Sequence, residues 1–248
     1  MSILAQDIVF YASENMPTDD TLPAGGAINS GVRVVFTNII NTGIIKAFSN
    51  NALDNQNLTI VGRNTNGSIV SETLSLNGTT IISGSQVFER ILLSSIDSFA
   101  SGIITIKEAY TNLNIGYIYQ NESGFRRPFY NSIAEACGGS NKILYEKIFV
   151  KNNNLNSDFL GVNITEISSG LYNNITFGLE KSQKYNESIF DRTTAPTGVT
   201  SYGNGPSGIP NFHLNSKSYQ GIWLKMDLDA CTAVQDDYYY LKVEGSTI

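Results

Sequence analysis

Charged side chains are scarce in this chain of 248 residues. Asp, Glu, Lys and Arg together make up 15% of it, whereas about a quarter is usual in globular proteins. The net charge is −6, and the longest basic run is the pair Arg126–Arg127. Because binding to a nucleic-acid backbone requires clustered Lys and Arg, we expect no nucleic-acid partner. Asn, Ser, Thr and Gly cover the surface instead, which suits protein contacts or polar ligands.

Long apolar runs are missing. No segment approaches the roughly 20 apolar residues of a membrane-spanning helix, so we expect no membrane partner. The first residues, "MSILAQDIVFYASENMP", lack the basic start and the long apolar stretch of a secretory signal. We therefore expect no cleaved signal peptide.

Histidine and cysteine are also rare. The single histidine, His213, lies in "PNFHLNS", where no motif supplies the nucleophile and the orienting group that a general base needs. Cys137 and Cys231 are far apart and belong to no CxxC motif, so they are too few for a zinc site. Whether they form a disulfide is open; without a secretory signal we favour two thiols.

Catalytic and ligand-binding motifs are missing as well. Asp19–Asp20 and Asp236–Asp237 could supply oxygen ligands to calcium, but no D-x-D-x-D loop closed by a Glu surrounds them. Glu72 and Glu89 could pair as glycosidase carboxylates, for which ordinary strand positions are the simpler interpretation. The stretch "GNGPSG" lacks the Lys-Ser/Thr of a phosphate loop, and no G-x-S-x-G occurs. We therefore expect a protein that is not an enzyme, with no catalytic residue, metal or cofactor.

Short runs of β-branched and aromatic residues occur along the whole chain, separated by polar turns, and this pattern predicts strands. An Asn-Gly step between two such runs is typical of a hairpin, and both Asn66–Gly67 and Asn77–Gly78 fit. The segment 16–31, "MPTDDTLPAGGAINSG", is rich in Pro and Gly and predicts a connection. The predicted strands are "DIVFYAS" (7–13), "RVVFTNI" (33–39), "NLTIVGR" (57–63), "SIVSETLSL" (68–76), "GIITIKEAY" (102–110), "IGYIYQ" (115–120), "KILYEKIFVKN" (142–152), "LGVNITEI" (160–167), "NITFGLE" (174–180), "GIWLKMDL" (221–228) and "DYYYLKVEGS" (237–246).

The strand between the two Asn-Gly steps has a hydroxyl-rich face and an apolar face. Side chains alternate along a strand, so Ser71 and Thr73 share one face, while Leu74 and Leu76 share the other. Glu72 interrupts the apolar face. A bulge or an edge position would explain it.

The chain is therefore expected to be all-β, with two tandem Ig-like or jelly-roll-like β-sandwich domains and at most one short helix, in "FYNSIAEACGG" (129–139). We place the N-terminal domain at 1–120 and the C-terminal domain at 121–248, because 121–139 breaks the strand pattern. The C-terminal domain contains a long Gly/Pro-rich loop at about 191–219, where the prolines exclude a central strand.

Aromatic residues are the candidates for ligand or partner contacts. Alternate rings of Tyr238–Tyr240 point to opposite faces of a strand, so at least one should be exposed or at an interface. With Trp223, Tyr219, Phe129 and Tyr130 they could form a sugar-stacking platform, although we favour packing in the core or between domains. The segment "FRRPFY" could anchor a protein interface, because Arg stacks on rings and pairs with carboxylates; salt bridges across the domain junction are an open alternative. The candidate partner-contact residues are Phe125, Arg126, Arg127, Phe129, Tyr130 and Tyr239.

Several stretches resemble a group of tailed-bacteriophage virion proteins. They are "DIVFYASENMPTDDTLPAGGAI", "LTIVGRNTNGSIVSETLSLNGTTIISGSQVFERIL", "ESGFRRPFYNSIAEACGGSNKILYEKIFVKNNN" and "QGIWLKMDLDA…YYLKVEGST". Together they cover most of the chain. The motifs describe strands and turns and carry no catalytic group.

The resemblance implies a non-enzymatic structural protein of the virion, assembled in the host cytoplasm. Its first implication is an accessory capsid protein of the decoration or cement type, which binds the major capsid protein or other virion proteins and associates with itself. A neck, tail or head-fibre component is the first alternative. A glycan-binding β-sandwich module on the virion surface is the second. A glycan hydrolase, the third hypothesis, would need two carboxylates about 5 to 10 Å apart in a groove.

Overall fold

The computed structural model describes residues 3–37, 39, 41–130, 140–166, 175–199, 201–203, 211–228 and 241–247. Apart from one 3-10 turn, η1 (Ala5–Asp7), the regular elements of these residues are strands. The prediction of an all-β protein is therefore confirmed. The helix predicted at 129–139 falls mainly outside the described residues, as do Cys137, Cys231 and Asp236–Asp237.

The chain divides into two compact units, and the first and last parts of the chain belong to the same one. Unit 1 comprises residues 1–29 and 128–248, and unit 2 comprises residues 30–127. Unit 2 is thus inserted into the sequence of unit 1. The two consecutive domains predicted from the sequence do not correspond to these units, because the predicted boundary at residue 120 lies inside unit 2.

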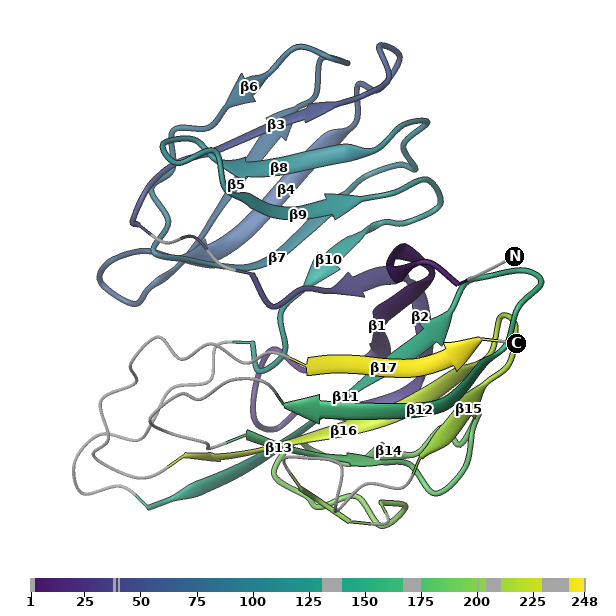
Figure 1. Ribbon diagram of the computed structural model, residues 1–248. Helices are drawn as coiled ribbons and strands as arrows, with labels where there is room; N and C mark the ends of the chain where they lie inside the picture. Colours follow the sequence, from purple (N-terminus) through teal and green to yellow (C-terminus); the bar gives the residue numbers. More distant parts are fainter. Residues whose placement is uncertain are drawn as a thin grey trace. The chain divides into compact units, whose positions relative to one another are not determined.

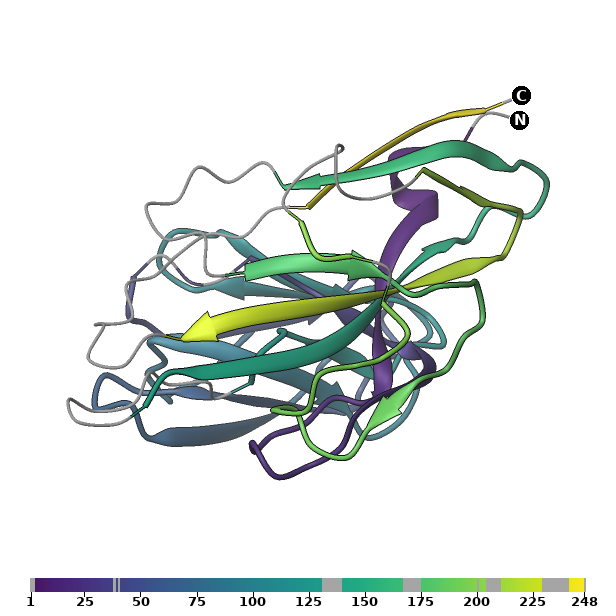
Figure 2. The same ribbon diagram turned by 90° about the horizontal axis from the view of Figure 1, so that it is seen from below.

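Unit 1 contains one large sheet and one small sheet. Its strands are β1 (Ile8–Asn15), the first part of β2 (Ala24–Val34), β11 (Lys142–Asn152), β12 (Phe159–Glu166), β13 (Ile175–Leu179), β14 (Ser188–Ile189), β15 (Phe212–Leu214), β16 (Tyr219–Leu228) and β17 (Leu241–Thr247). The large sheet has the order β13-β16-β11-β1-β2, with β14 also on β2, and the small sheet has the order β15-β12-β17. Figure 2 shows β17, which leads to the C-terminus, in a layer apart from β11 and β16.

Pairing between distant segments explains why unit 1 is discontinuous in sequence. β1 pairs antiparallel with β11, so that Ile8 lies opposite Asn152 and Ala12 opposite Ile148. β1 and β2, from the first part of the chain, therefore share a sheet with β11, β13 and β16 from the second half. No local sequence pattern indicates this pairing, so the boundary predicted at residue 120 does not take it into account.

Unit 2 is a β-sandwich. Its strands are the last part of β2, β3 (Ile45–Ser49), β4 (Asn57–Arg63), β5 (Ile69–Ser75), β6 (Ile82–Ser83), β7 (Arg90–Ile96), β8 (Ile104–Glu108), β9 (Asn114–Ile118) and β10 (Gly124–Arg126). One sheet has the order β2-β10-β7-β4-β5 and the other β6-β3-β8-β9, and Figure 1 shows them as two layers. Side chains of both sheets, such as Ile60 of β4 and Ile106 of β8, form one apolar cluster.

Strand β2 begins earlier than predicted. It starts within the segment 16–31, which the sequence assigned to a connection, and it ends at the second residue of the strand predicted at 33–39. Gly25 explains the difference. It has a φ of +93°, and a Cβ there would lie 2.8 Å from the Trp223 ring. The glycine therefore lets a strand pass close to the indole and does not mark a turn.

The hairpin predicted at Asn66–Gly67 is confirmed, since β4 and β5 pair antiparallel along their length. The turn is wider than a two-residue turn. Asn64 Oδ1 accepts hydrogen bonds from the amides of Asn66 and Ser68, both at 3.0 Å, and only Gly67 of the Asn-Gly pair has a positive φ, of +75°. The second step, Asn77–Gly78, leads from β5 of one sheet to β6 of the other.

The two faces predicted for β5 are also confirmed. Ser71 and Thr73 are exposed, whereas Leu74 is buried. β5 lies at the edge of its sheet, and Glu72 uses this position: its Oε1 accepts hydrogen bonds from the amide of Ser85 at 2.7 Å and from the Ser85 hydroxyl at 3.0 Å. An edge position therefore accounts for the carboxylate on the apolar face.

The Gly/Pro-rich loop predicted at about 191–219 contains one short strand, β15. This strand lies at an edge of the three-stranded sheet, where it pairs with β12. An edge position agrees with the expectation that the prolines exclude a central strand.

Candidate functional site

The predicted partner-contact segment is divided between the two units. Phe125 to Arg127 belong to unit 2, and Phe129 and Tyr130 belong to unit 1. Phe125 is 1% exposed and lies in the apolar cluster of unit 2. Arg126 and Arg127 are half-buried, and Arg127 donates hydrogen bonds to two backbone carbonyls of its own unit. The segment therefore contributes to the interior of the protein.

Phe129 and Tyr130 are held inside unit 1. Both side chains are buried. The Phe129 amide donates to Oε2 of Glu146 at 2.7 Å, and the Tyr130 carbonyl accepts from Nη1 of Arg192 at 2.9 Å. Neither ring offers an exposed surface to a partner. Tyr239 lies outside the described residues, so a partner contact there stays a prediction.

A buried ion pair is the main charged feature of unit 1. Lys147 of β11 pairs with Glu180, which follows β13, and neither side chain has any exposed surface. The Lys147 ammonium also donates to the carbonyls of Gly26 and Tyr185, both at 3.0 Å, and to that of Glu187 at 3.4 Å. Because charges away from water are costly unless their hydrogen-bonding groups are satisfied, this arrangement requires the surrounding main chain to be fixed in place.

Burial shifts the pKa values of both groups toward the neutral forms. It lowers the pKa of Lys147 and raises the pKa of Glu180, while the attraction between the two groups opposes both shifts. Aromatic rings lie around the ammonium: Nζ is 4.7 Å from the Phe149 ring centroid and 5.8 Å from that of Trp223. Trp223 is itself fully buried, as core packing predicts and a sugar platform does not. The ion pair cannot touch a substrate, and we assign it a structural role.

A second network joins the loops of unit 1. Arg192 donates to Asp20 from Nε at 2.7 Å, and its Nη1 lies 3.3 Å from Oε1 of Glu146. Lys142 pairs with the other Asp20 oxygen at 3.0 Å. Burial opposes ionisation of Asp20, but the hydrogen bonds from Lys142 and Arg192 hold the pKa of Asp20 below its ordinary value. Asp20 is therefore an ion-pair partner in this structure, which leaves its carboxylate occupied.

The sequence contains a signal for these two networks that the strand pattern hides. Glu146 and Lys147 are adjacent charged residues in "KILYEKIFVKN", and β11 is buried on both of its faces over this stretch. A charged residue in such a run requires a buried partner. The sequence does not indicate that the partners are Arg192 and Glu180.

The remaining sequence candidates make local structural contacts. His213 lies in β15, where its Nδ1 accepts a hydrogen bond from the Gly161 amide at 3.0 Å. Glu72 binds the segment after β6, as described above. Within the described ranges, no group of three or more His, Cys, Asp or Glu side chains could hold a metal ion.

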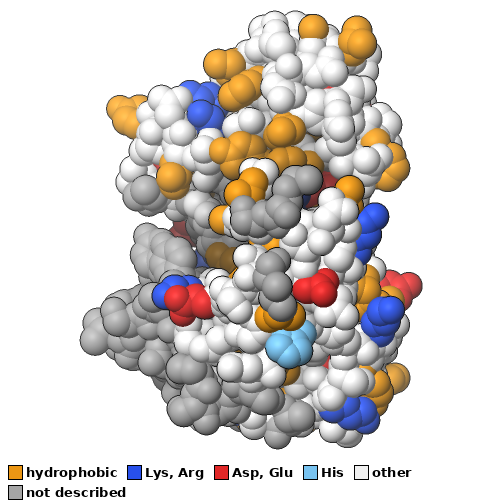
Figure 3. All heavy atoms as spheres, turned by 45° about the vertical axis from the view of Figure 1, so that its right-hand side comes forward, with side chains coloured by type: hydrophobic (Ala, Val, Ile, Leu, Met, Phe, Trp, Pro, Cys, Tyr) orange, Lys and Arg blue, Asp and Glu red, His pale blue; other side chains and the backbone are white. Residues whose placement is uncertain are grey.

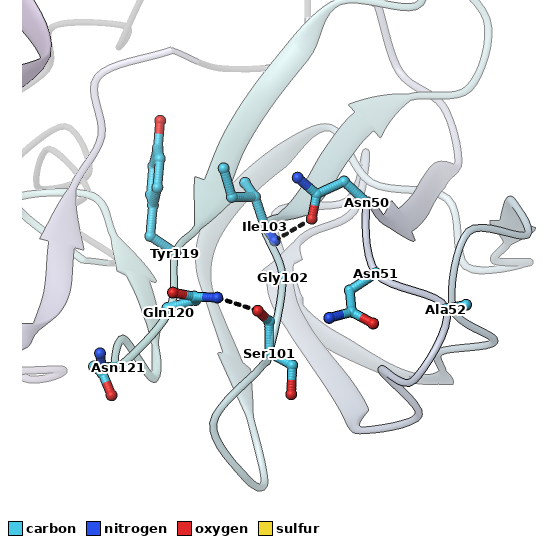
Figure 4. A pocket seen from close by; sticks show the side chains of 9 residues that line it. All are labelled: Asn50, Asn51, Ala52, Ser101, Gly102, Ile103, Tyr119, Gln120 and Asn121. Carbon is cyan, nitrogen blue, oxygen red and sulfur yellow. Dashed lines mark hydrogen bonds between the residues drawn. The ribbon is translucent and has the colours of Figure 1, made fainter.

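Unit 2 has a polar cavity of about 630 Å³, formed by three loops that connect strands of its two sheets. One loop precedes β4, one precedes β8 and one follows β9. The described residues that line it are Asn50, Asn51, Ala52, Ser101, Gly102, Ile103, Tyr119, Gln120 and Asn121 (Figure 4). This cavity was not indicated by any sequence motif, because its residues come from three separate turns.

Asp54 fixes two walls of the cavity. Its carboxylate is fully buried and accepts hydrogen bonds from the Ser49 hydroxyl at 2.5 Å and from the amides of Ser101 and Gly102 at 2.7 and 2.9 Å. Burial opposes ionisation, but these hydrogen bonds hold the pKa of Asp54 below its ordinary value. The ionised carboxylate thus ties the loop before β4 to the loop before β8.

No protein-family model matches the chain, and no match is found among the curated proteins or the solved structures with which we compared it. In the part of the chain that the structure describes, no helical segment has the length and apolar character needed to cross a membrane.

Proposed function

We propose that this chain is a non-enzymatic structural protein of a bacteriophage particle, an accessory capsid protein of the decoration or cement type that binds the major capsid protein lattice. The observation that supports this best is how the buried ionisable groups are used. Lys147 pairs with Glu180 and donates to main-chain carbonyls. Glu146 and Arg192 pair with each other and also bind the main chain. Catalysis requires acids and bases that contact a substrate. These side chains are buried and bound to each other, so they cannot make such a contact. The resemblance of the sequence to tailed-phage virion proteins supplies the phage setting.

The surface also suits attachment to other proteins. Figure 3 shows one face on which charged side chains are few and apolar side chains lie among uncharged side chains and backbone. Each square ångström of apolar surface buried in a contact contributes about 25 cal/mol, before the costs of association. Among the described residues, the large apolar side chains that are more than half exposed are Leu53, Ile81, Phe99 and Tyr110 in unit 2 and Leu4, Leu155 and Phe190 in unit 1.

Quantitative mass spectrometry of purified particles tests this proposal. The copy number is referenced to the major capsid protein. A number in the hundreds, proportional to the capsid subunits, is the result expected for a decoration protein. A few copies to a few dozen would instead move the protein to the neck, tail or a head fibre.

A binding experiment complements the copy number. Empty heads that lack the protein are incubated with the purified chain and sedimented. Saturable co-sedimentation supports attachment to the capsid lattice. Absence of the protein from particles, together with no binding to heads, would overturn the virion role.

A further inference from the structure

The polar cavity of unit 2 carries no charged side chain among its described lining residues. Four of these are carboxamides: Asn50, Asn51, Gln120 and Asn121. The NH₂ group of a carboxamide can donate hydrogen bonds to the hydroxyl oxygens of a sugar. We propose that this cavity binds one unit of a neutral saccharide. The proposal does not depend on the virion role.

The walls of the cavity are fixed before any ligand binds. Oδ1 of Asn50 accepts a hydrogen bond from the Ile103 amide at 2.8 Å, and Gln120 Nε2 donates to the Ser101 carbonyl. Gly102 allows the loops to approach closely, because a Cβ there would lie 2.4 Å from Oδ1 of Asn50. Figure 4 shows Gln120 on one side of the Ser101–Ile103 segment and Asn50 on the other. A site with fixed walls loses little conformational entropy on binding.

Several donors at the cavity are free to bind a ligand. The oxygen atoms of Asn50 and Asn51 accept hydrogen bonds from the amides of Ile103 and Leu53, so the orientation of both side chains is set. Their Nδ2 groups make no hydrogen bond to any described residue, and neither does the Asn121 side chain. The carboxamide oxygens of Asn50 and Asn51 thus stabilise the loops, while their NH₂ groups can donate to a ligand. A site that binds hydroxyl oxygens requires such donors.

An apolar surface accompanies these donors. Tyr119 and Ile103 both line the cavity, and a sugar ring presents C–H groups that pack against such side chains. The Arg33 guanidinium lies 3.8 Å from the centroid of the Tyr119 ring and pairs with Glu122 at 2.6 Å, which holds the ring in place. A sugar presents both hydroxyl groups and C–H surface, whereas a purely polar solute would gain nothing from the apolar side chains of the cavity.

Charge and size exclude other ligand classes. No described lining residue is cationic, so a phosphate or another anion would gain no ion pair. Two described carboxylates bind the lining segments. Asp54 already accepts hydrogen bonds on both oxygens, and Glu122 accepts one from Arg33 and one from the Tyr119 amide, so neither is available to a cation. The volume of about 630 Å³ lies within the range of about 300 to 1,000 Å³ for small-molecule sites.

Titration by NMR tests the proposal on the full chain. The ¹⁵N-labelled protein is titrated with glucose, galactose, mannose and N-acetylglucosamine, and with N-acetylneuraminic acid as a charged comparison. We expect at least one neutral sugar to shift the side-chain NH₂ resonances of Asn50, Asn51 and Asn121, with a dissociation constant on the order of 1 mM. No saturable shift with any neutral sugar, or shifts confined to other residues, would overturn the proposal.

Two variants remove donors and keep the fold. Asn50→Asp keeps the acceptor for Ile103 but loses the free NH₂, and Asn121→Gly removes a carboxamide at a φ of +63°, which glycine adopts readily. Each should weaken sugar binding about tenfold, the loss expected for one hydrogen bond.

The matched controls lie at the other ends of the same strands. Asn66→Asp adds the same charge in the β4–β5 turn, and Asn112→Gly makes the same change at a φ of +63° in the β8–β9 turn. Both controls should bind as the unaltered protein does. Equal weakening by variants and controls would place the ligand elsewhere and contradict the assignment.

Discussion

The two units stabilise their interiors by different means. Unit 2 has an apolar cluster of fifteen buried residues, and its buried carboxylate Asp54 binds hydroxyl and amide donors at a loop. Unit 1 carries complete ion pairs inside: Lys147 with Glu180 and Arg192 with Glu146. In unit 2, neutral donors satisfy the buried Asp54 carboxylate, and the ion pair of Glu122 with Arg33 keeps the arginine side chain 21% exposed. In unit 1, both members of the Lys147–Glu180 pair are fully buried, so the opposite charges depend on one another.

The two kinds of interior contribute differently to stability and to the placement of strands. An apolar cluster contributes free energy in proportion to the area buried and tolerates some rearrangement. A buried ion pair contributes little net stability, but loss of one partner leaves an unpaired charge. The pairing of Lys147 with Glu180 therefore fixes how β11 and the end of β13 are placed, while unit 2 relies on the fit of its two sheets.

The largest expected effect on the free energy of unfolding comes from breaking the ion pair of unit 1. Lys147→Met leaves Glu180 buried without its partner and should lower the free energy of unfolding by about 3–5 kcal/mol. Urea unfolding followed by Trp223 fluorescence measures it, since Trp223 is the single tryptophan of the chain and belongs to unit 1. The double variant Lys147→Met/Glu180→Leu should recover most of the loss. A single variant within about 1 kcal/mol of the unaltered protein would contradict this account.

The matching change in unit 2 acts through volume. Leu58→Ala removes a fully buried side chain and should cost about 2–5 kcal/mol, because a cavity remains in the cluster. Hydrogen exchange followed by mass spectrometry locates the lost protection, which we expect in β4 and β7. The control Leu53→Ala changes the same residue type at 81% exposure and should alter stability by less than about 0.5 kcal/mol. If both substitutions lowered the free energy of unfolding equally, the apolar cluster would not be what stabilises unit 2.

A smaller effect concerns pH. The pKa of Asp54 is held below its ordinary value of 3.8, so its stabilisation is complete above pH 3.8 and is lost as the pH falls through the folded-state pKa. Asp54→Asn should lower the free energy of unfolding by about 1–3 kcal/mol at neutral pH, because its NH₂ must face the donating amide of either Ser101 or Gly102, which bind different oxygens of Asp54. Measured at acid pH, the difference between this variant and the unaltered protein should shrink. A difference that stays constant with pH would mean that Asp54 is not ionised in the folded state.

The smallest expected effect on stability comes from replacing one exposed side chain in each unit. Phe190→Ser in unit 1 and Tyr110→Ser in unit 2 change residues that are 82% and 90% exposed. Each should alter the free energy of unfolding by less than about 0.5 kcal/mol. If one of them is central to attachment, its loss should weaken binding to empty heads by about tenfold or more, and co-sedimentation shows which unit carries the contact. Unchanged binding in both would exclude these two side chains from the attachment surface.

Strands and turns could be predicted from the sequence where the controlling contacts are local. Alternation along 68–76 placed Ser71 outside and Leu74 inside, and the Asn66–Gly67 step located the hairpin. The same reasoning was wrong for β2, because Gly25 serves a contact with Trp223 that is remote in sequence. It also offered "FRRPFY" as a candidate interface anchor, with salt bridges as the alternative, and the structure places Phe125 of this segment in the interior. A local pattern does not show which neighbours a side chain meets.

The sequence by itself determined that the chain is all-β, since a period of two is set by the alternation of neighbouring side chains. It also determined that charged side chains are few, at 15% of the residues. Only the tertiary structure decided that β1 joins β11, that Glu180 meets Lys147, and that three separate turns enclose one polar cavity. The physical reason is that strand pairing and buried charge pairing depend on contacts between distant segments, and many such pairings are compatible with the same local pattern.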